Sequence, residues 1–367
     1  MIAERTTVTI GIAFPGSIDG SAWSGIPAGL REGLRAHGAT VVHLRSSAPD
    51  PVQRVVGRLP GWRVRNVLDA VALSRAIRRE RSRLDGILLV GSLVAPRTLL
   101  PVVTYEDMTV RQAVAVNEPF VVGRSRGEVE AWVARQQSIY ERAAGVCTLG
   151  RWAADSVVAD YGIPLERVHC VGAGVNHMPA RAERDWSIPR FLFIGKDFQR
   201  KNGPAVLRAF AALREERPDA TLDVVGGHPP LSQPGVTGHG LLSLANPDER
   251  ARVSALLRTA TCFVMPSSYE PFGIVYAEAA MAGVPSIATS VGGTFVDEDC
   301  GRRVDPADVG ALLQAMRELS DGEVARRLGA SAAERADAFT WPLVAGRVLR
   351  CFAEAGGAAV DRLPPYL

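Results

Sequence analysis

Two glutamates eight positions apart, Glu270 and Glu278, flank the start of a predicted helix. An apolar run ends at Met265, a loop carries Glu270, and the helix is expected to begin near Gly273. The amides at a helix N-terminus have no intrahelical partner and lie at the positive end of the helix dipole, so they suit a phosphate. Gly273 also allows a ligand to approach the backbone closely. This pattern predicts a site for a phosphorylated ligand.

The two carboxylates suit hydroxyl groups on either side of such a phosphate. Glu278 lies about one turn inside the helix, in a run that is otherwise apolar from Ala277 to Ala282. A carboxylate among apolar residues needs a partner, and the two neighbouring hydroxyls of a ribose supply one. Glu270 could bind the hydroxyls of a sugar beyond the phosphates. The alternatives are an exposed helix carboxylate for Glu278 and a loop or N-cap residue for Glu270.

Both lysines of the chain lie in one short loop after a predicted strand at Phe191–Ile194. Lysine and arginine total 42, yet the only lysines are Lys196 and Lys201, with Arg200 between them. Ligands bind at the C-terminal ends of strands in parallel sheets, where such cations could neutralise a diphosphate and the charge that grows on it as its bond to a sugar breaks. The alternative is an ordinary basic loop in an arginine-biased sequence.

The elements that must position these residues alternate between apolar runs and amphipathic stretches. In the first half this pattern predicts strands at Val8–Phe14, Ala39–Leu44, Gly86–Val90, Pro101–Thr104, Val146–Leu149 and Val168–Val171, with helices at Pro27–His37, Arg65–Arg83, Val129–Ala143 and Arg151–Tyr161. In the second half it predicts strands at Phe191–Ile194, Leu222–Val225, Cys262–Met265 and Ser286–Ala288, with helices at Pro204–Glu216, Asp248–Thr259 and Ile274–Ala282, and a mostly helical remainder. The alternation predicts an α/β fold with parallel sheets covered on both faces.

Length and composition agree with two domains of ordinary size. The chain has 367 residues, of which 47% are hydrophobic and 22% charged, and its net charge of +3 is too low to indicate nucleic-acid binding. The start of the chain lacks a signal-peptide pattern, and no apolar run approaches the length of a spanning helix. The five cysteines match neither a disulfide framework nor a zinc site. We therefore expect a cytoplasmic protein with free thiols and no metal site.

An arginine-rich stretch between Arg54 and Arg83 includes a predicted basic helix. Weak peripheral contact with anionic lipid, or with an acidic acceptor, is one interpretation. A solvated helix face is the other, and it is favoured on general grounds.

Taken together, these segments resemble the retaining glycosyltransferases of the GT-B fold, in particular glycosyltransferase family four. The resemblance rests on the Glu-x7-Glu pattern of Glu270 and Glu278, and on a Gly-Arg/Lys-x4-Lys loop matched by Gly195, Lys196 and Lys201. It covers nearly the whole chain. It implies two doubly wound Rossmann-like domains that face a central cleft. The implied acceptor domain is 1–175, the implied nucleotide-sugar domain is 176–342, and the segment 343–367 is a helix that crosses back to the first domain.

The resemblance assigns a role to each matching residue. The diphosphate would be held by Lys196 and Lys201, beside Gly195 and Arg200. Glu270 would bind the donor sugar and Glu278 the ribose. Further donor contacts would come from Gly25 in an N-terminal glycine loop, Gly240 and Leu241 in a loop that cups the nucleobase, and the backbone of Phe272, Gly273 and Ile274.

Two departures from the family pattern affect the reacting centre. Many members carry a histidine at the end of the fourth N-terminal strand, where this chain has Thr104-Tyr105-Glu106-Asp107. We expect Glu106 or Asp107 to lie near the reacting carbon instead. The segment after Gly292-Gly293 is shorter than usual and lacks the common Pro-Glu pair.

The predicted function is transfer of a sugar from a UDP- or GDP-sugar, with retention and without a metal or other cofactor. The expected partners are the sugar nucleotide and a small-molecule, natural-product or envelope-glycan acceptor. A sugar-nucleotide epimerase or phosphorylase and a non-catalytic sugar-nucleotide binder are the alternatives on the same fold. A nicotinamide dehydrogenase is disfavoured because the loop Pro15–Gly20 lacks the Gly-x-Gly-x-x-Gly pattern.

Overall fold

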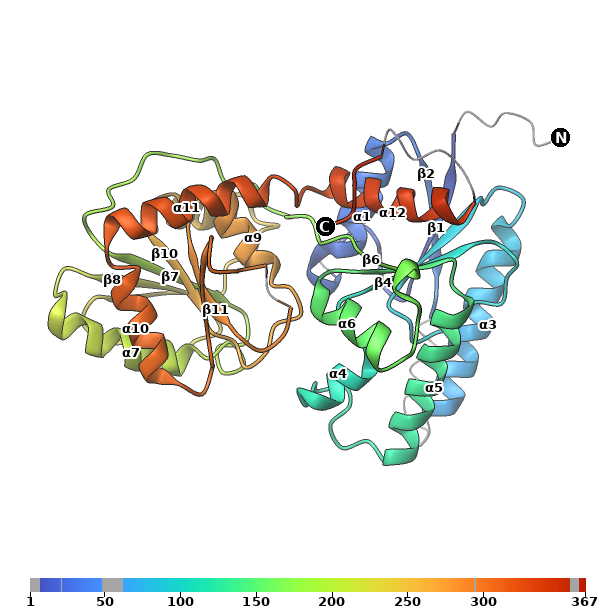
Figure 1. Ribbon diagram of the computed structural model, residues 1–367, viewed down its shortest axis with the longest axis horizontal. Coiled ribbons are helices and arrows are strands. Elements are labelled where there is room, and N and C mark those ends of the chain that lie inside the picture. The colour runs from blue at the N-terminus through green and yellow to red at the C-terminus, as the bar shows by residue number, and fades with distance from the viewer. Residues whose placement is uncertain (1–6, 21, 48–61, 294, 357–362) are drawn as a thin grey trace. The chain divides into compact units, whose positions relative to one another are not determined.

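The structure, a computed structural model, describes residues 7–20, 22–47, 62–293, 295–356 and 363–367. It divides into two compact units (Figure 1). The first unit comprises Met1–Gly174 together with Trp341–Leu367, and the second comprises Val175–Thr340. Each unit is a parallel sheet with helices packed against it.

Among the described residues, the first unit has a six-stranded parallel sheet in the order β2-β1-β3-β4-β5-β6. Its strands are β1 (Thr9–Phe14), β2 (Thr40–Arg45), β3 (Gly86–Val90), β4 (Val102–Glu106), β5 (Gly145–Thr148) and β6 (Val168–Cys170). Its helices are α1 (Ile26–Ala36), α3 (Trp62–Glu80), α4 (Val110–Ala115), α5 (Arg126–Arg142), α6 (Arg151–Ala159) and α12 (Trp341–Ala355), with short 3₁₀ turns η1 (Ala22–Gly25) and η2 (Leu165–Arg167). The chain reverses its direction across the sheet between β1 and β3, which makes a topological switch point there.

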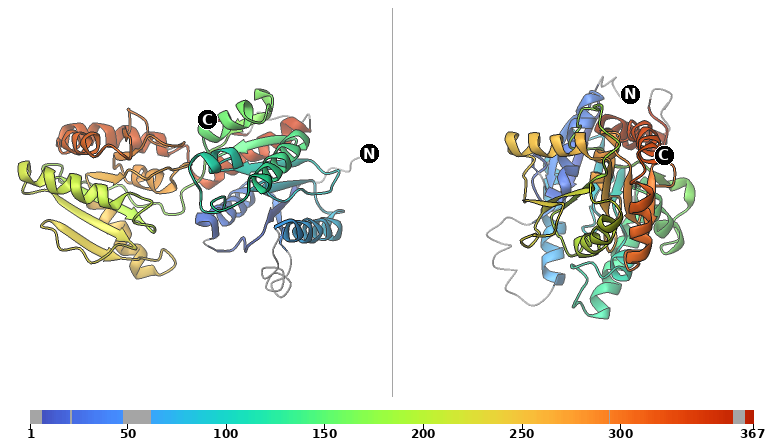
Figure 2. Two further views of the ribbon diagram at one scale, coloured as in Figure 1. Left: turned by 90° about the horizontal axis from the view of Figure 1, so that it is seen from below. Right: turned by 90° about the vertical axis from the view of Figure 1, so that its left-hand side faces the viewer.

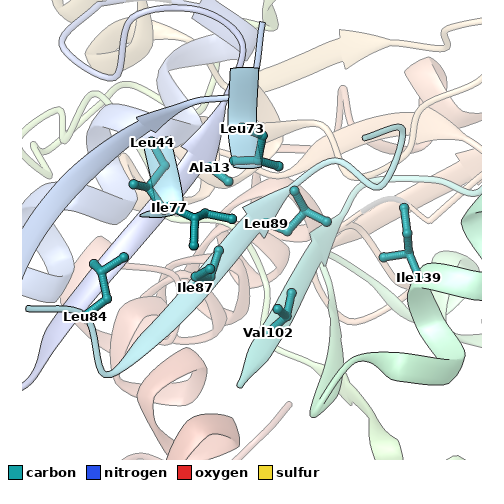
Figure 3. Close-up of a cluster of buried hydrophobic side chains, with 9 residues drawn as sticks. All are labelled: Ala13, Leu44, Leu73, Ile77, Leu84, Ile87, Leu89, Val102 and Ile139. Atoms are coloured by element: carbon teal, nitrogen blue, oxygen red, sulfur yellow. The ribbon is translucent and has the colours of Figure 1, made fainter. Parts of the chain in front are cut away.

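The apolar face of α3 is buried against one face of the first sheet. Leu73 and Ile77 of α3 contact Ile87 and Leu89 of β3, and Ile139 of α5 belongs to the same cluster (Figure 3). The arginines of the stretch from Arg54 to Arg83 follow a different pattern: Arg75, Arg78, Arg79, Arg81 and Arg83 are exposed, while Arg54 and Arg58 lie outside the described residues. Membrane contact through this stretch stays a prediction.

Helix α12 packs closely on α1 because small residues allow it; Figure 1 labels the two helices, and Figure 2 gives two further views of the fold. A Cβ atom on Gly29 would lie 2.0 Å from Cε2 of Trp341, and one on Gly33 would lie 2.3 Å from the Trp341 carbonyl oxygen. Gly174 also meets this indole, at 2.5 Å from Cδ2. The C-terminal helix is therefore an integral part of the first unit.

We expect Gly29→Ala to destabilise the first unit by about 1–3 kcal/mol, because the added methyl group overpacks against the Trp341 ring. Gly127→Ala is the matched control, since an added Cβ on Gly127 meets nothing within 4 Å. Urea unfolding followed by tryptophan fluorescence measures both. Equal unfolding midpoints for the two variants would contradict the close packing of α12.

The second unit repeats the architecture with a six-stranded parallel sheet, again among the described residues, in the order β12-β11-β10-β7-β8-β9. Its strands are β7 (Arg190–Gly195), β8 (Thr221–Gly226), β9 (Val236–Gly240), β10 (Cys262–Met265), β11 (Ser286–Thr289) and β12 (Gly301–Val304). Its helices are α7 (Gly203–Glu216), α8 (Pro247–Thr259), α9 (Ile274–Met281), α10 (Val309–Glu318) and α11 (Gly322–Ala336). Helix α7 packs beside α10, and α9 packs beside α11 (Figure 1).

The strands and helices predicted from the sequence are confirmed, apart from the exact residues at their ends. Helix α4 and strands β9 and β12 were not predicted. The remainder after β11, predicted to be mostly helical, also contains β12. Strand β9 has the sequence Val-Thr-Gly-His-Gly, whose glycines conceal its extended conformation. None of the described helices combines the length and the apolar character needed to cross a bilayer.

Candidate functional site

The loop that carries both lysines leaves β7 at a point where two strand ends nearly touch. A Cβ atom on Gly226 at the end of β8 would lie 1.9 Å from the carbonyl oxygen of Gly195, and Gly226 has a φ of +138°. A Cβ on Gly195 would lie 2.9 Å from Cγ of Lys201. Glycine at both positions therefore lets the Lys201 stem lie over the end of the sheet.

A tight turn returns the chain from β7 to α7. The Lys201 amide donates to the carbonyl oxygen of Asp197 at 2.9 Å, and the Arg200 amide donates to the Asp197 carboxylate at 3.0 Å. Asn202 then adopts the left-handed conformation, with φ of +62°, and no side chain described in the structure caps α7. This turn fixes Lys201 directly before a helix N-terminus.

Lys201 and Glu270 form a buried ion pair through Nζ and Oε2. Their side chains are only 14% and 10% exposed, and the Ser267 hydroxyl donates to the same carboxylate oxygen at 3.3 Å. Burial lowers the pKa of Lys201, and the Arg200 charge lowers it further, while Glu270 opposes both. The pair is thus held in a region where neither charge is well solvated.

The other two cations of the loop lie differently. The Arg200 guanidinium donates to the Tyr269 carbonyl oxygen at 3.2 Å and lies 5.0 Å from the centroid of the Tyr269 ring. Lys196 is exposed, and its carbonyl oxygen accepts from the Gly227 amide at 3.3 Å. Arg200 therefore braces the Glu270 loop, whereas Lys196 extends into solvent.

The backbone around Glu270 is fixed on both sides. The Glu270 amide donates to the carbonyl oxygen of Val291 at 3.0 Å, and the Glu270 carbonyl oxygen accepts from the Gly293 amide at 3.0 Å. Glu270 pairs with Gly292 in a parallel bridge, and a Cβ on Gly292 would lie 2.2 Å from the Glu270 carbonyl oxygen. The loop after β10 is thereby tied to the loop after β11.

Helix α9 begins beside this carboxylate at Gly273. Gly273 has a φ of +75°, and a Cβ there would lie 2.3 Å from the Tyr276 ring and 3.0 Å from Cγ of Glu270. No side chain described in the structure caps the helix, so its first amides are left for a ligand. Ile274 is the first residue of the helix, and the preceding Phe272 packs its ring against Phe295 and Phe339.

Glu278 lies one turn further along α9 and is 8% exposed. The Asn176 amide donates to its Oε1 at 3.3 Å. Burial raises the pKa of Glu278 to about 7, although amide hydrogen bonds from Asn176 and His177 lower it. Two adjacent hydroxyl donors of a ligand could add to these amide hydrogen bonds.

Replacing Glu278 by Gln should stabilise the ligand-free protein at high pH. Because the folded-state pKa is raised from 4.5 to about 7, stability is lost as the pH rises through this interval. The loss in the free energy of unfolding is on the order of 3 kcal/mol by pH 8, and it does not occur in the glutamine variant because an amide does not ionise. The melting-temperature difference between Glu278→Gln and wild type should therefore grow in favour of the variant from pH 5 to pH 8.

The exposed Glu334→Gln on α11 serves as the control, and its difference from wild type should stay flat with pH. A flat difference for Glu278→Gln as well would show that Glu278 is not a buried charge.

Breaking the Lys201–Glu270 pair should lower the stability of the protein, because removal of either side chain leaves the charge of the other buried and unpaired. Lys201→Met or Glu270→Leu alone should each destabilise the second unit by about 3 kcal/mol. The double variant should recover most of that loss, since two apolar side chains replace two buried charges. Urea unfolding of the four proteins gives this double-mutant cycle, and additive losses would contradict the pairing.

The segment expected to cup a nucleobase is partly a strand. Residues 238–240 end the edge strand β9, so the loop begins only at Leu241, which is 64% exposed. The Gly240 amide donates to His228 Nε2 at 2.9 Å, and Gly240 has a φ of +67° that turns the chain out of the strand. Leu241 thus presents an apolar surface beyond the sheet.

The remaining predicted residues belong to the first unit. Gly25 ends a run of three left-handed residues that includes Trp23 and Ser24, with φ of +45°, +55° and +77° from Trp23 to Gly25.

Asp107 follows β4 and accepts from the Trp23 indole at 3.2 Å and from the Met108 amide at 2.8 Å. Burial raises the pKa of Asp107 to about 6. Glu106 is 2% exposed, and burial raises its pKa well above the ordinary value.

Several supporting residues were not identified from the sequence. Ser267 binds Glu270, and the Tyr276 hydroxyl donates to the Met265 carbonyl oxygen at 2.5 Å, so that α9 is fixed to the end of β10. Trp23 holds Asp107. Ser267 and Tyr276 lie inside the Glu-x7-Glu segment, so their neighbourhood was visible in the sequence, but the long-range contact of Trp23 with Asp107 left no signal. No cluster of three metal-ligating side chains occurs in the described part of the chain.

The chain is similar to known glycosyltransferases. Residues 188–321 match the family described as Glycosyl transferases group 1. The chain is 30% identical over 252 residues to the D-inositol 3-phosphate glycosyltransferase of Paenarthrobacter aurescens (strain TC1), covering 62% of each protein. It is 27% identical over 238 residues to the glycogen synthase of Mycobacterium tuberculosis (strain H37Rv), covering 59% of this chain and 54% of that enzyme. The aligned part therefore spans less than two thirds of these relatives.

The fold matches over the whole chain. Sucrose-phosphate synthase from Thermosynechococcus elongatus superposes with a TM-score of 0.71 at 21% identity, over 96% of this chain and 100% of that one. The predicted GT-B fold is confirmed, as is the resemblance to the glycosyltransferases.

Proposed function

Because residues 188–321 match the family described as Glycosyl transferases group 1, we propose that the chain transfers a sugar from a nucleoside diphosphate sugar to an acceptor hydroxyl. The observation that carries the proposal is the clustering of Lys201, Glu270 and the start of α9, with Glu278 one turn beyond. A positive charge and uncapped amides suit a diphosphate, and the carboxylates on either side suit sugar hydroxyls.

The donor binds along α9 in this proposal. Its ribose hydroxyls donate to Glu278, whose pKa is raised by burial in the absence of a ligand. Its phosphates lie against Lys201, the exposed Lys196 and the amides of Gly273 and Ile274. The transferred sugar meets Glu270, and the base lies near Leu241. A uridine or guanosine diphosphate fits this arrangement equally.

The transfer is a single displacement at the anomeric carbon. The bond between this carbon and the phosphate oxygen breaks, and the acceptor oxygen bonds to the same carbon from the same face. The departing diphosphate takes the acceptor proton. Lys201 and the α9 amides stabilise the charge that develops on the diphosphate, and they are placed before the reaction begins. The anomeric configuration is retained, and no metal is required.

Removal of the Lys201 charge should lower kcat at least about 100-fold, because one preorganised stabiliser of a leaving oxyanion has about that effect. We expect this loss for Lys201→Ala and for Glu270→Ala. Arg208→Ala removes an exposed cation from α7, the helix that follows Lys201, and should leave turnover unchanged. The assay follows sugar transfer after a thermal-shift screen of UDP-, GDP- and TDP-sugars selects the donor.

Four further outcomes of this assay are decisive. Retention predicts that the anomeric proton couplings of the product match those of an α-linked donor, and activity should persist in a chelator. Conversion of the donor without any acceptor would instead indicate an epimerase. Normal turnover in both alanine variants would exclude this donor site.

A further inference from the structure

A cavity of about 460 Å³ lies wholly within the first unit, at the C-terminal ends of its central strands. Phe14 ends β1, Val90 ends β3 and Glu106 ends β4, and all three line it. Strand order reverses between β1 and β3, so the cavity lies at the topological switch point, where doubly wound sheets bind ligands. Its volume suits a small molecule.

Much of the cavity wall is apolar, but its charged groups all have one sign. Phe14, Leu93, Met108 and Phe120 supply hydrocarbon surface. The described lining contains three ionisable residues, Glu106, Asp107 and Glu118, which are all acidic, and Glu118 already interacts with another group. A ligand that neutralised Glu106 and Asp107 would therefore bring its own positive charge.

Glu106 is the residue that most needs such a ligand. It is 2% exposed, and no donor in the described structure reaches its buried Oε1. Burial raises the pKa of Glu106 most, hydrogen bonds from the side chain and backbone of Ser92 lower it, and the neighbouring Asp107 raises it further. Asp107 itself already accepts from Trp23 and Met108. Two adjacent carboxyl groups in an apolar pocket repel each other when both are ionised, and a cation between them removes that cost.

We propose that this cavity is the acceptor site and that it selects a cyclic amino alcohol, whose protonated amine lies against Glu106 and Asp107. The inference rests on the proposed transfer function and adds the class of acceptor to it. The ammonium group supplies three hydrogen-bond donors to a site rich in acceptors, and the ring packs on the apolar wall. A hydroxyl of the same ring is then the nucleophile. A phosphorylated acceptor is disfavoured, because its charge would oppose that of the Asp107 carboxylate.

Four sugars with the same ring test this selection at pH 7, in the absence of any sugar nucleotide. Glucosamine carries an ammonium group, N-acetylglucosamine and glucose are neutral, and glucose 6-phosphate is anionic. Calorimetric titration should show glucosamine binding at least about tenfold more tightly than either neutral ring, and glucose 6-phosphate binding most weakly. Equal affinities, a preference for glucose 6-phosphate, or no binding of glucosamine would overturn the proposal.

Two isosteric variants assign the effect to the carboxyls. Glu106→Gln and Asp107→Asn should reduce the preference for glucosamine over N-acetylglucosamine to about twofold or less. Their affinity for the neutral ring should stay within twofold of wild type, which shows that the cavity keeps its shape. Glu130→Gln on the exposed side of α5 should keep the full preference. A full preference in both cavity variants would contradict the assignment.

Sugar transfer to the same four rings separates this inference from the proposed function. Transfer to glucose or glucose 6-phosphate in preference to glucosamine would leave the glycosyltransferase proposal standing and refute the acceptor class. Tight glucosamine binding with no transfer from any donor would refute the function instead.

Discussion

A buried lysine that follows β7 and two buried glutamates that follow β10 impose the main constraint on this structure. Lys201 and Glu270 compensate each other, whereas Glu278 has two backbone amides and a pKa raised by burial to about 7. Charges in such positions cost stability unless they are paired. Their presence is understandable if a ligand with hydroxyl and phosphate groups completes the set, since such a ligand supplies further hydrogen-bond donors to Glu278.

Backbone contacts that only glycine allows bring these charges together. Gly195 and Gly226 let the ends of β7 and β8 approach, and Gly273 begins α9 in a left-handed conformation next to Glu270. Gly292 lets the loop after β11 lie against Glu270. The same device recurs in the first unit, where Gly29 and Gly33 admit Trp341. The backbone thus approaches closely where side chains must be fixed, at the site and under the C-terminal helix.

The sequence predicts the frame of the site because each part is local. Glu270, Gly273 and Glu278 lie within nine residues, and the apolar strand, the turn and the helix around them have strong signals. The pairing of Lys201 with Glu270 was not predicted, since it joins positions 69 residues apart. Nor was the hold of Trp23 on Asp107, 84 residues away. Strand β9 was mistaken for a loop because its glycines carry no strand propensity. Site residues that lie close together in the sequence can therefore be predicted from it, but the distant residues that bind them can be identified only from the fold.

A crystal structure with the nucleoside diphosphate that most raises the melting temperature tests this account most directly. The account predicts phosphate oxygens within hydrogen-bond distance of Lys201 and of the first amides of α9, with the ribose hydroxyls on Glu278. A nucleotide bound elsewhere in the protein, with Glu278 still buried against Asn176 and nothing at the start of α9, would contradict it.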